Sequence, residues 1–498
     1  MKKRLLIANR GEIAIRIIRS AHKLGLMAAV FQSDREPDAL YLKYADEVIP
    51  AGDSANEKAI FLDPERIVQL ALEHKIDLIH PGYGFLSENP DFAQLCIDNG
   101  IDFVGPSPEL IRDMGLKTVA KSMAIKAGLP LVPGSDGPVK DAAEAKKYAD
   151  KIGYPVILKA SAGGGGRGMR IVEKPETIER SFKSASEEAL GAFGNGDMFV
   201  EKYLQNPKHI EFQILGDKFG HVVHLGEREC SLQRKHQKIV EEAPSASVTP
   251  EMRSQMGDMA VRFAKAIGYY SVGTIEFIMD EDGSYYFMEM NTRIQVEHPV
   301  TEMVSGVDLV DWQIRVALDQ KLTLEQKDIQ IKGWAIECRV NTEDPQNRFS
   351  PQTGFIDDVH FPEGDGIRIE TGVQNGSVVT PYFDSMIAKI IVLGENREDV
   401  IRKTINALNE FSLIGLKTTV PFCRLVLQTP EFIDASYTTR WVDQIYTPEM
   451  LENEEDEMVG ALAATIMYAS EYLQLSSDIP SYKSDRLNVW VLNKRLNY

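Results

Sequence analysis

The stretch GTIEFIMDEDGSYYFMEMNTRIQVEHP, residues 273–299, contains two strand-like runs on either side of Asp282 and Gly283. An Asp-Gly pair between such runs is a strong signal for a tight hairpin. With a two-residue turn, the register places Glu276 directly opposite Glu289. Like charges about 5 Å apart cost roughly 3 kcal/mol at an effective dielectric near 20, so this pairing is normally avoided. A divalent cation between the carboxylates removes the cost, and Mg²⁺ or Mn²⁺ bridging nucleotide phosphates suits these hard oxygen ligands.

The alternation of polar and apolar residues continues beyond the hairpin. Polar residues take the odd positions and apolar residues the even ones, namely Glu289, Asn291, Arg293, Gln295 and Glu297 against Met288, Met290, Ile294 and Val296. The pattern predicts a strand with one polar face. An ordinary strand with a solvated face is the simpler interpretation. The mixture of acids, an amide and a guanidinium differs from the Lys, Thr and Ser of such strands. It favours a strand whose polar face lines an active site.

A glycine-rich segment, KASAGGGGRGM, precedes the hairpin at residues 159–169. Lys159 ends one predicted strand, and a run of four glycines follows before the next strand at 169–172, namely Gly163, Gly164, Gly165 and Gly166. Glycines allow backbone N–H groups to approach phosphate oxygens, and lysine adds a positive charge. No GK[ST] opens a helix here, so this is not a Walker A loop. We interpret it as a flexible flap over phosphates, with a surface turn as the alternative.

The composition excludes several classes of protein. The 498 residues are 43% hydrophobic, and the length suggests about three domains. The formal net charge of −19 argues against a nucleic-acid partner, because phosphate backbones bind basic surfaces. Four cysteines lie far apart and form no metal-binding motif, namely Cys96, Cys230, Cys338 and Cys423. No apolar run approaches about eighteen residues, so we expect no membrane segment and a cytoplasmic protein.

The predicted elements divide the chain into units. Strand and helix alternate at the start, with a strand at 3–8, a helix at 12–24 and a strand at 28–32, as in a parallel sheet covered by helices. The GxGxxG fingerprint is absent after the first strand, which argues against a nicotinamide enzyme. Short strands are predicted from the glycine flap to Val296, and a third unit begins near Gly333 with a strand at 334–341.

Three further segments contain chemically useful groups. EKYL at 201–204 with His209, and QRKHQK at 233–238, can bind anions or nucleotides, although structural histidines and basic surface turns are the commoner explanations for each alone. On the predicted strand at 334–341, Arg339 is either a structural ion-pair partner or a ligand clamp. Acidic residues at 452–457 indicate a solvated linker, followed by a predicted amphipathic helix from Val459.

Together these segments resemble the biotin carboxylase family. The motifs are IANRGEIAIRIIR, HPGYGFLSEN, KASAGGGGRGM, EKYL, KHIEFQ, QRKHQK, EMNTRIQVEHPVTE and ECRVN, collinear over about residues 1–445. The segments RIQVEHPVTE and HPGYGFLSEN are the most specific. The resemblance implies an α/β fold in four parts: an N-terminal doubly wound parallel-sheet domain at 1–115, an ATP-grasp domain at 116–330 with a glycine-rich lid at about 132–205, a C-terminal α+β domain at 331–445, and an acidic linker and tail at 446–498.

The resemblance implies that the chain carboxylates biotin with ATP and bicarbonate through carboxyphosphate. It assigns ATP binding to Lys117, Lys159, Gly163, Gly164, Gly165, Gly166, Glu201, Lys202, Leu204, His209, Gln233, His236, Glu276 and Glu289. Two sites for Mg²⁺ or Mn²⁺ would involve Glu276, Glu289 and Asn291. Bicarbonate would bind to Lys238, Arg293, Gln295 and Val296. Glu297 would be the base and Arg339 the biotin-binding residue, and the catalytic set would be Glu297, Arg339, Arg293 and Lys238.

The sequence also departs from the family pattern. Leu116 stands where an aspartate usually precedes Lys117, and Lys23 and Asp365 are not the residues expected at the dimer interface of relatives. A homodimer is nevertheless expected. No Met-Lys-Met biotinylation motif is present, so we expect biotin on a separate carrier protein and the carboxyltransferase on another polypeptide, with the tail as a docking segment.

Two other functions remain open at this point. Another ATP-grasp ligase would share the flap and the glutamate pair, although Arg339 and the HPGYGFLSEN segment argue against it. A non-catalytic homologue that binds ATP would lack turnover, whereas every expected catalytic position is filled here. The final carboxyl acceptor, whether acetyl-CoA, propionyl-CoA, pyruvate or 2-oxoglutarate, is not encoded in these motifs.

Overall fold

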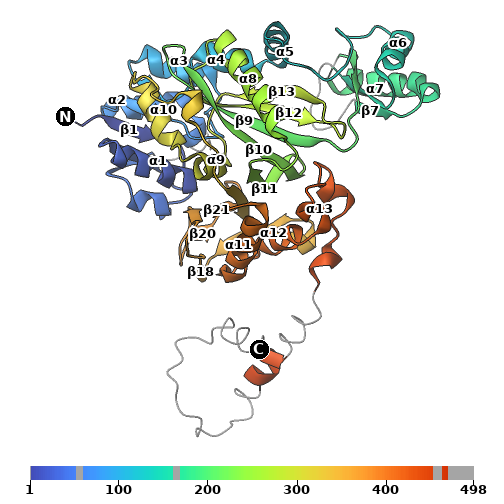
Figure 1. The fold of residues 1–498 in the computed structure, drawn as a ribbon. Helices are drawn as coiled ribbons and strands as arrows, with labels where there is room; N and C mark the ends of the chain where they lie inside the picture. Colours follow the sequence, from blue (N-terminus) through green and yellow to red (C-terminus); the bar gives the residue numbers. More distant parts are fainter. Residues whose placement is uncertain (1, 52–59, 161–168, 194, 453–461, 469–498) are drawn as a thin grey trace. The chain divides into compact units, whose positions relative to one another are not determined.

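The structure is a computed structural model that describes residues 2–51, 60–160, 169–193, 195–452 and 462–468. Met1–Pro448 forms one compact unit (Figure 1), and the described residues after Pro448 belong to a second unit. The flap glycines 163–166 and the acidic run after Glu452 lie outside the described residues. Of the expected tail helix, residues 462–468 are described and are helical. Across the described ranges no helix has the length and apolar character needed to cross a membrane.

The N-terminal part is a five-stranded parallel sheet of order β3-β2-β1-β4-β5, as the strand and helix alternation predicted. Its strands are β1 Arg4–Ile7, β2 Met27–Gln32, β3 Glu47–Pro50, β4 Leu78–His80 and β5 Asp102–Phe103, and its helices α1 Gly11–Lys23, α2 Pro64–Glu73, α3 Pro90–Asp98 and α4 Pro108–Gly115. The last three helices each begin with a proline after a capping side chain, from Asp63, Asn89 and Ser107. Such caps satisfy backbone N–H groups at the helix start.

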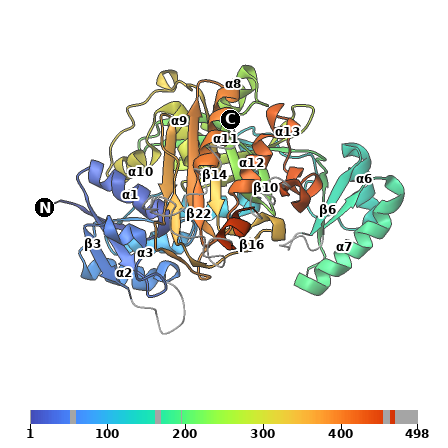
Figure 2. The same cartoon turned by 90° about the horizontal axis from the view of Figure 1, so that it is seen from below.

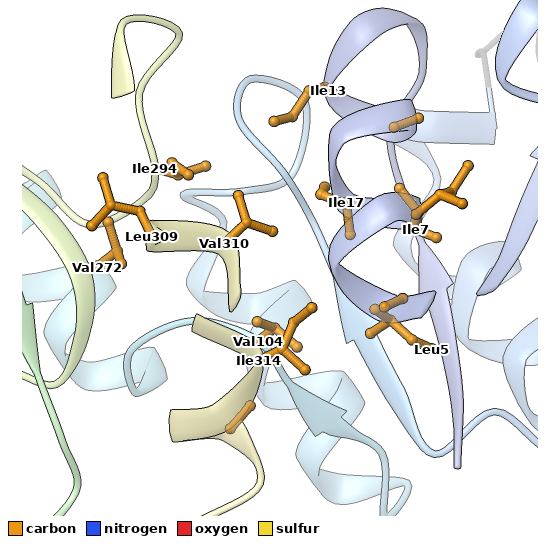
Figure 3. Close-up of a cluster of buried hydrophobic side chains, with 14 of the residues drawn as sticks. Leu5, Ile7, Ile13, Ile17, Val104, Val272, Ile294, Leu309, Val310 and Ile314 are labelled. Atoms are coloured by element: carbon orange, nitrogen blue, oxygen red, sulfur yellow. The ribbon is translucent and has the colours of Figure 1, made fainter. Parts of the chain in front are cut away.

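Both faces of this sheet are covered. Side chains of β1 and the residue after it alternate between two cores, because Leu5 and Ile7 belong to one cluster and Leu6 and Ala8 to the other. Figure 3 shows the first cluster, in which α1 side chains meet those of α10 (Leu309–Ala317). This shared core joins the N-terminal sheet to the central part of the chain.

The segment around the glycine flap forms a small antiparallel sheet of order β7-β6-β8. Its strands are β6 Val156–Ala160, β7 Met169–Val172 and β8 Met198–Lys202, and the nearby helices are α5 Lys117–Lys126, α6 Ala142–Ile152 and α7 Ile178–Phe193. Helices α6 and α7 pack on this sheet (Figure 2). Its core is small and consists mainly of valine and alanine, so few apolar contacts hold this lid-like segment together.

The central element is an eight-stranded antiparallel sheet of order β13-β12-β9-β10-β11-β14-β21-β19. The strands are β9 Lys208–Gly216, β10 Val222–Arg234, β11 Gln237–Ala243, β12 Ser271–Met279, β13 Tyr285–Asn291, β14 Trp334–Asn341, β19 Ile367–Thr371 and β21 Met386–Gly394. The predicted boundaries of β7 and β14 are confirmed. However, β14, β21 and β19 continue the central sheet directly, so the third unit is not a separate layer.

Strands dominate between the flap and Val296, as predicted, but two helices that the sequence analysis did not predict also lie there. Helices α7 and α8 (Pro250–Ala266) interrupt the strands, and Thr249 caps α8. The remaining helices are α9 His298–Ser305, α11 Arg397–Glu410, α12 Val420–Leu427, α13 Pro430–Ile433 and α14 Trp441–Gln444. Short strands pair outside the large sheets, namely β15 Glu343–Asp344, β16 Ser350–Pro351, β17 Gly354–Phe355, β18 Asp358–His360, β20 Val378–Val379 and β22 Ser412–Ile414.

Candidate active site

One cavity of about 900 Å³ brings the predicted site residues together. It lies against the central sheet and the lid-like segment. All predicted positions in the described part of the chain line it, namely Lys117, Lys159, Glu201, Lys202, Leu204, His209, Gln233, His236, Lys238, Glu276, Glu289, Asn291, Arg293, Gln295, Val296, Glu297 and Arg339. The four flap glycines fall outside the described residues. A cavity of this size suits a nucleotide together with small co-substrates.

The hairpin of β12 and β13 places Glu276 directly opposite Glu289, as predicted. The predicted two-residue turn was wrong. Met279 pairs with Tyr285, and Asp280 N–H donates to the Ser284 carbonyl at 2.7 Å, which leaves a longer turn. A register shift between Glu276 and Phe277 then restores the predicted pairing, because one extra residue of β13 is accommodated as a bulge.

The acidic row extends further than the hairpin. Strand β9 places Glu211 beside Glu276, and β10 places Arg228 beside Glu211, so three carboxylates and a guanidinium cross four strands. Lys238 on β11 lies over this row. Its Nζ donates to Glu211 at 2.5 Å and lies 3.4 Å from Glu276. Buried cations thus neutralise the inner carboxylates.

His209 also helps to neutralise the buried carboxylates. Its Nε2 lies 3.2 Å from Glu276 Oε2. Burial alone would lower the pKa of His209, but Glu276 outweighs it and raises the pKa to about 9. Burial would raise the pKa of Glu276, yet Lys238 and His209 lower it well below its ordinary range. His209 is therefore an imidazolium at neutral pH and Glu276 a carboxylate.

Glu289 is the exception in the row. Burial and the neighbouring charge of Glu276 raise its pKa, and no described residue donates a hydrogen bond to its carboxylate or forms an ion pair with it. A carboxylate that lacks such a partner and faces another carboxylate fits a divalent cation, since hard oxygen ligands on a rigid hairpin are what such ions require. The donor atoms of His209, Glu211 and Glu276 also lie within 4.8 Å of one another, but Lys238 and Arg228 already neutralise that set.

The predicted strand through residues 289–297 was wrong beyond its first part, because β13 ends at Asn291. The following residues turn instead, yet their polar side chains still enter the cavity. Arg293 Nε donates to Glu88 at 2.9 Å. Gln295 Nε2 donates to Glu276 at 2.8 Å, and its oxygen accepts from Arg228 at 2.6 Å. Tertiary bonds, not strand alternation, orient this segment.

Glu297 lies between the two cationic residues at the inner end of the cavity. Its Oε1 accepts from Lys238 Nζ at 2.6 Å and its Oε2 from Arg339 Nη2 at 2.9 Å. Burial would raise the pKa of Glu297, but Lys238, with Arg339 and Arg228, holds it below its ordinary value. Glu297 is thus an ionised carboxylate that can accept a proton.

Arg339 has a second carboxylate partner. Its Nε donates to Glu241 at 2.6 Å. Burial raises the pKa of Glu241 to about 7 despite the nearby Arg339. Two carboxyl groups therefore hold one guanidinium at the cavity wall. This fixed geometry leaves the planar cation available to an anionic oxygen in the cavity.

The opposite end of the cavity is formed by the lid-like segment and the C-terminal helices. Glu201 accepts from Lys121 at 3.0 Å and also pairs with Lys159. Arg440 lies over the Tyr203 ring at 4.6 Å and donates to the Leu204 carbonyl at 3.2 Å. Arg440, which lies 236 positions after Leu204 in the chain, therefore holds the segment at 201–204 in place.

Sequence reasoning missed several charged residues that hold the predicted site residues in place, namely Glu88, Glu211, Arg228, Glu241 and Arg440. Glu211 had a usable signal, because it follows His209 by two positions on a strand and must share its face. Glu88 lies in the HPGYGFLSEN segment, one of the family motifs, and accepts a hydrogen bond from Arg293. No local pattern distinguishes Arg228, Glu241 or Arg440 from ordinary charged residues.

Three family models match successive parts of the chain. Residues 1–111 match the family described as "Biotin carboxylase, N-terminal domain". Residues 117–325 match "Carbamoyl-phosphate synthase L chain, ATP binding domain", and residues 337–444 match "Biotin carboxylase C-terminal domain". The three matches leave only short gaps before residue 444.

Individual relatives are similar over most of their length. The chain is 51% identical over 444 residues to the 2-oxoglutarate carboxylase small subunit of Hydrogenobacter thermophilus, covering 89% of this chain and 94% of that protein. It is 44% identical over 491 residues to one subunit of the pyruvate carboxylase of Methanothermobacter thermautotrophicus, covering 98% of this chain and 100% of that one. A solved biotin carboxylase domain of a thermophilic 2-oxoglutarate carboxylase bound to bicarbonate matches with a TM-score of 0.87 at 48% identity, covering 91% of this chain and 100% of that one. The chain therefore belongs to the biotin carboxylase family of ATP-dependent ligases.

Proposed function

We propose that this chain carboxylates biotin with ATP and bicarbonate, and that Glu297 is the base that starts the reaction. The observation that carries the proposal is the position of Glu297, with one carboxylate oxygen on Lys238 and the other on Arg339. Glu297 therefore lies between Lys238, which is assigned to bicarbonate, and Arg339, which is assigned to biotin. A base at this position is close to the sites of both substrates.

Bicarbonate would be received by Lys238, Arg293, Gln295 and Val296, next to Glu297. Proton transfer to Glu297 makes a bicarbonate oxygen nucleophilic, and that oxygen attacks the γ-phosphorus of ATP. The bond to ADP breaks and carboxyphosphate forms. Carboxyphosphate then separates into carbon dioxide and phosphate, the released phosphate takes the proton of a biotin ureido nitrogen, and that nitrogen bonds to the carbon of carbon dioxide. Arg339 would stabilise the negative charge on the ureido oxygen in that step.

ATP would be held mainly by lid residues and by the outer part of the sheet. The assigned residues are Lys117, Lys159, Gly163, Gly164, Gly165, Gly166, Glu201, Lys202, Leu204, His209, Gln233, His236, Glu276 and Glu289. Lys159 is tied to Glu201 here, so phosphate binding would exchange that ion pair for a contact with the nucleotide. Closure of the flap would keep water from carboxyphosphate.

Glu276 and Glu289 would hold Mg²⁺ or Mn²⁺ in two sites. The ions would supply charge neutralisation between the γ-phosphate and these carboxylates. Asn291 is the third assigned ligand. Its amide nitrogen donates to Glu276 at 2.7 Å and its oxygen accepts from Arg293 at 3.1 Å, so the second lone pair of that oxygen is the one that could bind an ion.

Partners follow from the chemistry and the relatives. We propose that biotin arrives on a carrier protein, that a separate carboxyltransferase completes the reaction, and that the chain forms a homodimer in the cytoplasm. Relatives bear names of subunits of larger carboxylases, and a solved relative is described as a domain dimer. The domain division at 1–115, 116–330, 331–445 and 446–498 belongs to the same proposal. The match to the Methanothermobacter pyruvate carboxylase includes the tail, which supports a docking role for residues 446–498.

The test is ADP release by the purified protein with Mg²⁺ and ATP, measured with and without bicarbonate and free biotin. We expect release that needs both co-substrates. Glu297→Gln keeps the size of the side chain but removes the base, so it should abolish release while nucleotide binding persists. Release that is indifferent to biotin would instead indicate another ATP-grasp acceptor, and no release at all would indicate a non-catalytic homologue.

A further inference from the structure

Lys389 is a fully buried lysine with no assigned role. It lies on β21, directly opposite Arg339 on β14 and Glu370 on β19, and its side chain has no exposed area. Burying an ammonium group is costly unless it is paired and hydrogen-bonded. The contacts of its Nζ atom therefore indicate what the charge does.

The first contact reaches the segment assigned to bicarbonate. Lys389 Nζ donates to the Val296 carbonyl at 2.8 Å, across 93 positions of sequence. The same turn is held on its other side, because His298 Nδ1 lies 2.8 Å from the Gln295 carbonyl. The peptide that contains the Val296 carbonyl also contains the N–H of Glu297. Holding that carbonyl therefore sets the direction in which the Glu297 side chain leaves the backbone.

The second contact reaches the N-terminal sheet. Lys389 Nζ lies 3.3 Å from Glu12 Oε1, and that oxygen also accepts from the hydroxyl of Tyr83. Tyr83 belongs to the HPGYGFLSEN segment, whose Glu88 holds Arg293 from the other side. Lys389 therefore connects three distant parts of the chain at the point where the bicarbonate segment turns.

We infer that Lys389 is a positioning residue, which orients the Val296–Glu297 peptide for bicarbonate and is itself held by Glu12. The inference rests on the proposed function, because the role of Glu297 does. A merely structural ion pair would stabilise the fold and leave bicarbonate use unaffected. The two roles can be separated, because Glu12→Gln removes the ion pair and keeps the bond to Val296, whereas Lys389→Met removes both contacts.

The experiment compares Lys389→Met, Glu12→Gln and the double variant. Lys389→Met leaves a buried carboxylate without its partner, so it should lower the urea midpoint. The double variant removes that stranded charge and should recover much of the midpoint, while the bond to Val296 stays lost. We expect KM for bicarbonate to rise about tenfold in both Lys389→Met and the double variant, the usual effect of one hydrogen bond from a charged donor. KM for ATP should stay within about twofold in both. A double variant with an unchanged KM for bicarbonate would overturn the inference.

A second measurement does not depend on activity. Hydrogen exchange of the peptide that spans residues 295–298 should be faster in the double variant than in the unaltered protein, and unchanged exchange there would also overturn the inference. Arg253→Met with Glu227→Gln is the matched control, because it removes another ion pair, at 2.6 Å, that does not line the cavity. It should change neither readout. Failure of the proposed function would appear separately, as absent bicarbonate dependence in the unaltered protein.

Discussion

Arg228 is the residue whose removal should affect the site most. Its side chain is fully buried, and its Nε donates to Glu211 Oε1 at 2.5 Å. Further bonds reach Gln213 at 2.7 Å, Thr301 at 2.9 Å and Gln295 at 2.6 Å. Methionine has a similar length and no charge, so Arg228→Met removes the cation while disturbing the packing little.

The magnitude follows from the burial of Glu211. At a charge separation of about 4 Å and an effective dielectric near 20, the attraction lost is about 4 kcal/mol. Glu211 then stays buried beside Glu276 with Lys238 as its nearest cation. Breaking one side of a buried pair in this way typically costs about 3 to 5 kcal/mol. We therefore expect Arg228→Met to lower the free energy of unfolding by about 4 kcal/mol.

The assay is equilibrium urea unfolding of Arg228→Met, Glu211→Gln and the double variant, followed by far-UV circular dichroism. We expect the two substitutions to be coupled by at least about 2 kcal/mol in the free energy of unfolding, because the effects of substitutions within one buried network do not add. Additive losses would refute this account of the acidic row. Arg402→Met provides a surface control, since Arg402 is 66% exposed in its pair with Asp399, and its midpoint should not change.

Three further predictions concern pH, metal and nucleotide. Burial lowers the pKa of His80 from 6.5 to about 3. Between these two pH values the imidazole is protonated in the unfolded state and neutral in the folded state. Stability should therefore fall as the pH falls, by about 2 kcal/mol between pH 7 and pH 5 for this group, and urea titrations of His80→Gln should show a weaker pH dependence. Glu289→Gln should weaken Mn²⁺ binding in the presence of ADP at least about tenfold, measured by titration calorimetry, without lowering the melting temperature of the metal-free protein, because it removes a like-charged neighbour of Glu276. Arg440→Ala should raise KM for ATP several-fold and leave KM for bicarbonate unchanged, because its contacts are with Tyr203 and Leu204; equal changes in both constants would contradict this assignment.

The hairpin shows how far local reasoning extends. Alternation and the Asp-Gly pair predicted that Glu276 faces Glu289, and the structure confirms the pairing. The turn itself was predicted too short, and the bulge in β13 compensates for the difference. A bulge depends on how both strands pack against the rest of the sheet, so turn chemistry alone does not predict it.

Features that arise between near neighbours in the chain follow from the amino-acid sequence without further information. These include the strands β7 and β14, the facing glutamates and the motifs that identify the family. The prediction of a continuous strand through residues 289–297 was wrong, because the alternation there reflects a turn whose side chains are oriented by distant partners.

Which charges neutralise one another depends on tertiary structure. Arg339 meets Glu241 across 98 positions, and Lys238 meets Glu297 across 59. No local sequence pattern pairs such residues with each other. The electrostatic attraction within each pair becomes strong only after packing excludes water and lowers the local dielectric. The residues of the site can therefore be recognised in the sequence, but their charge states and orientations depend on the folded core around them.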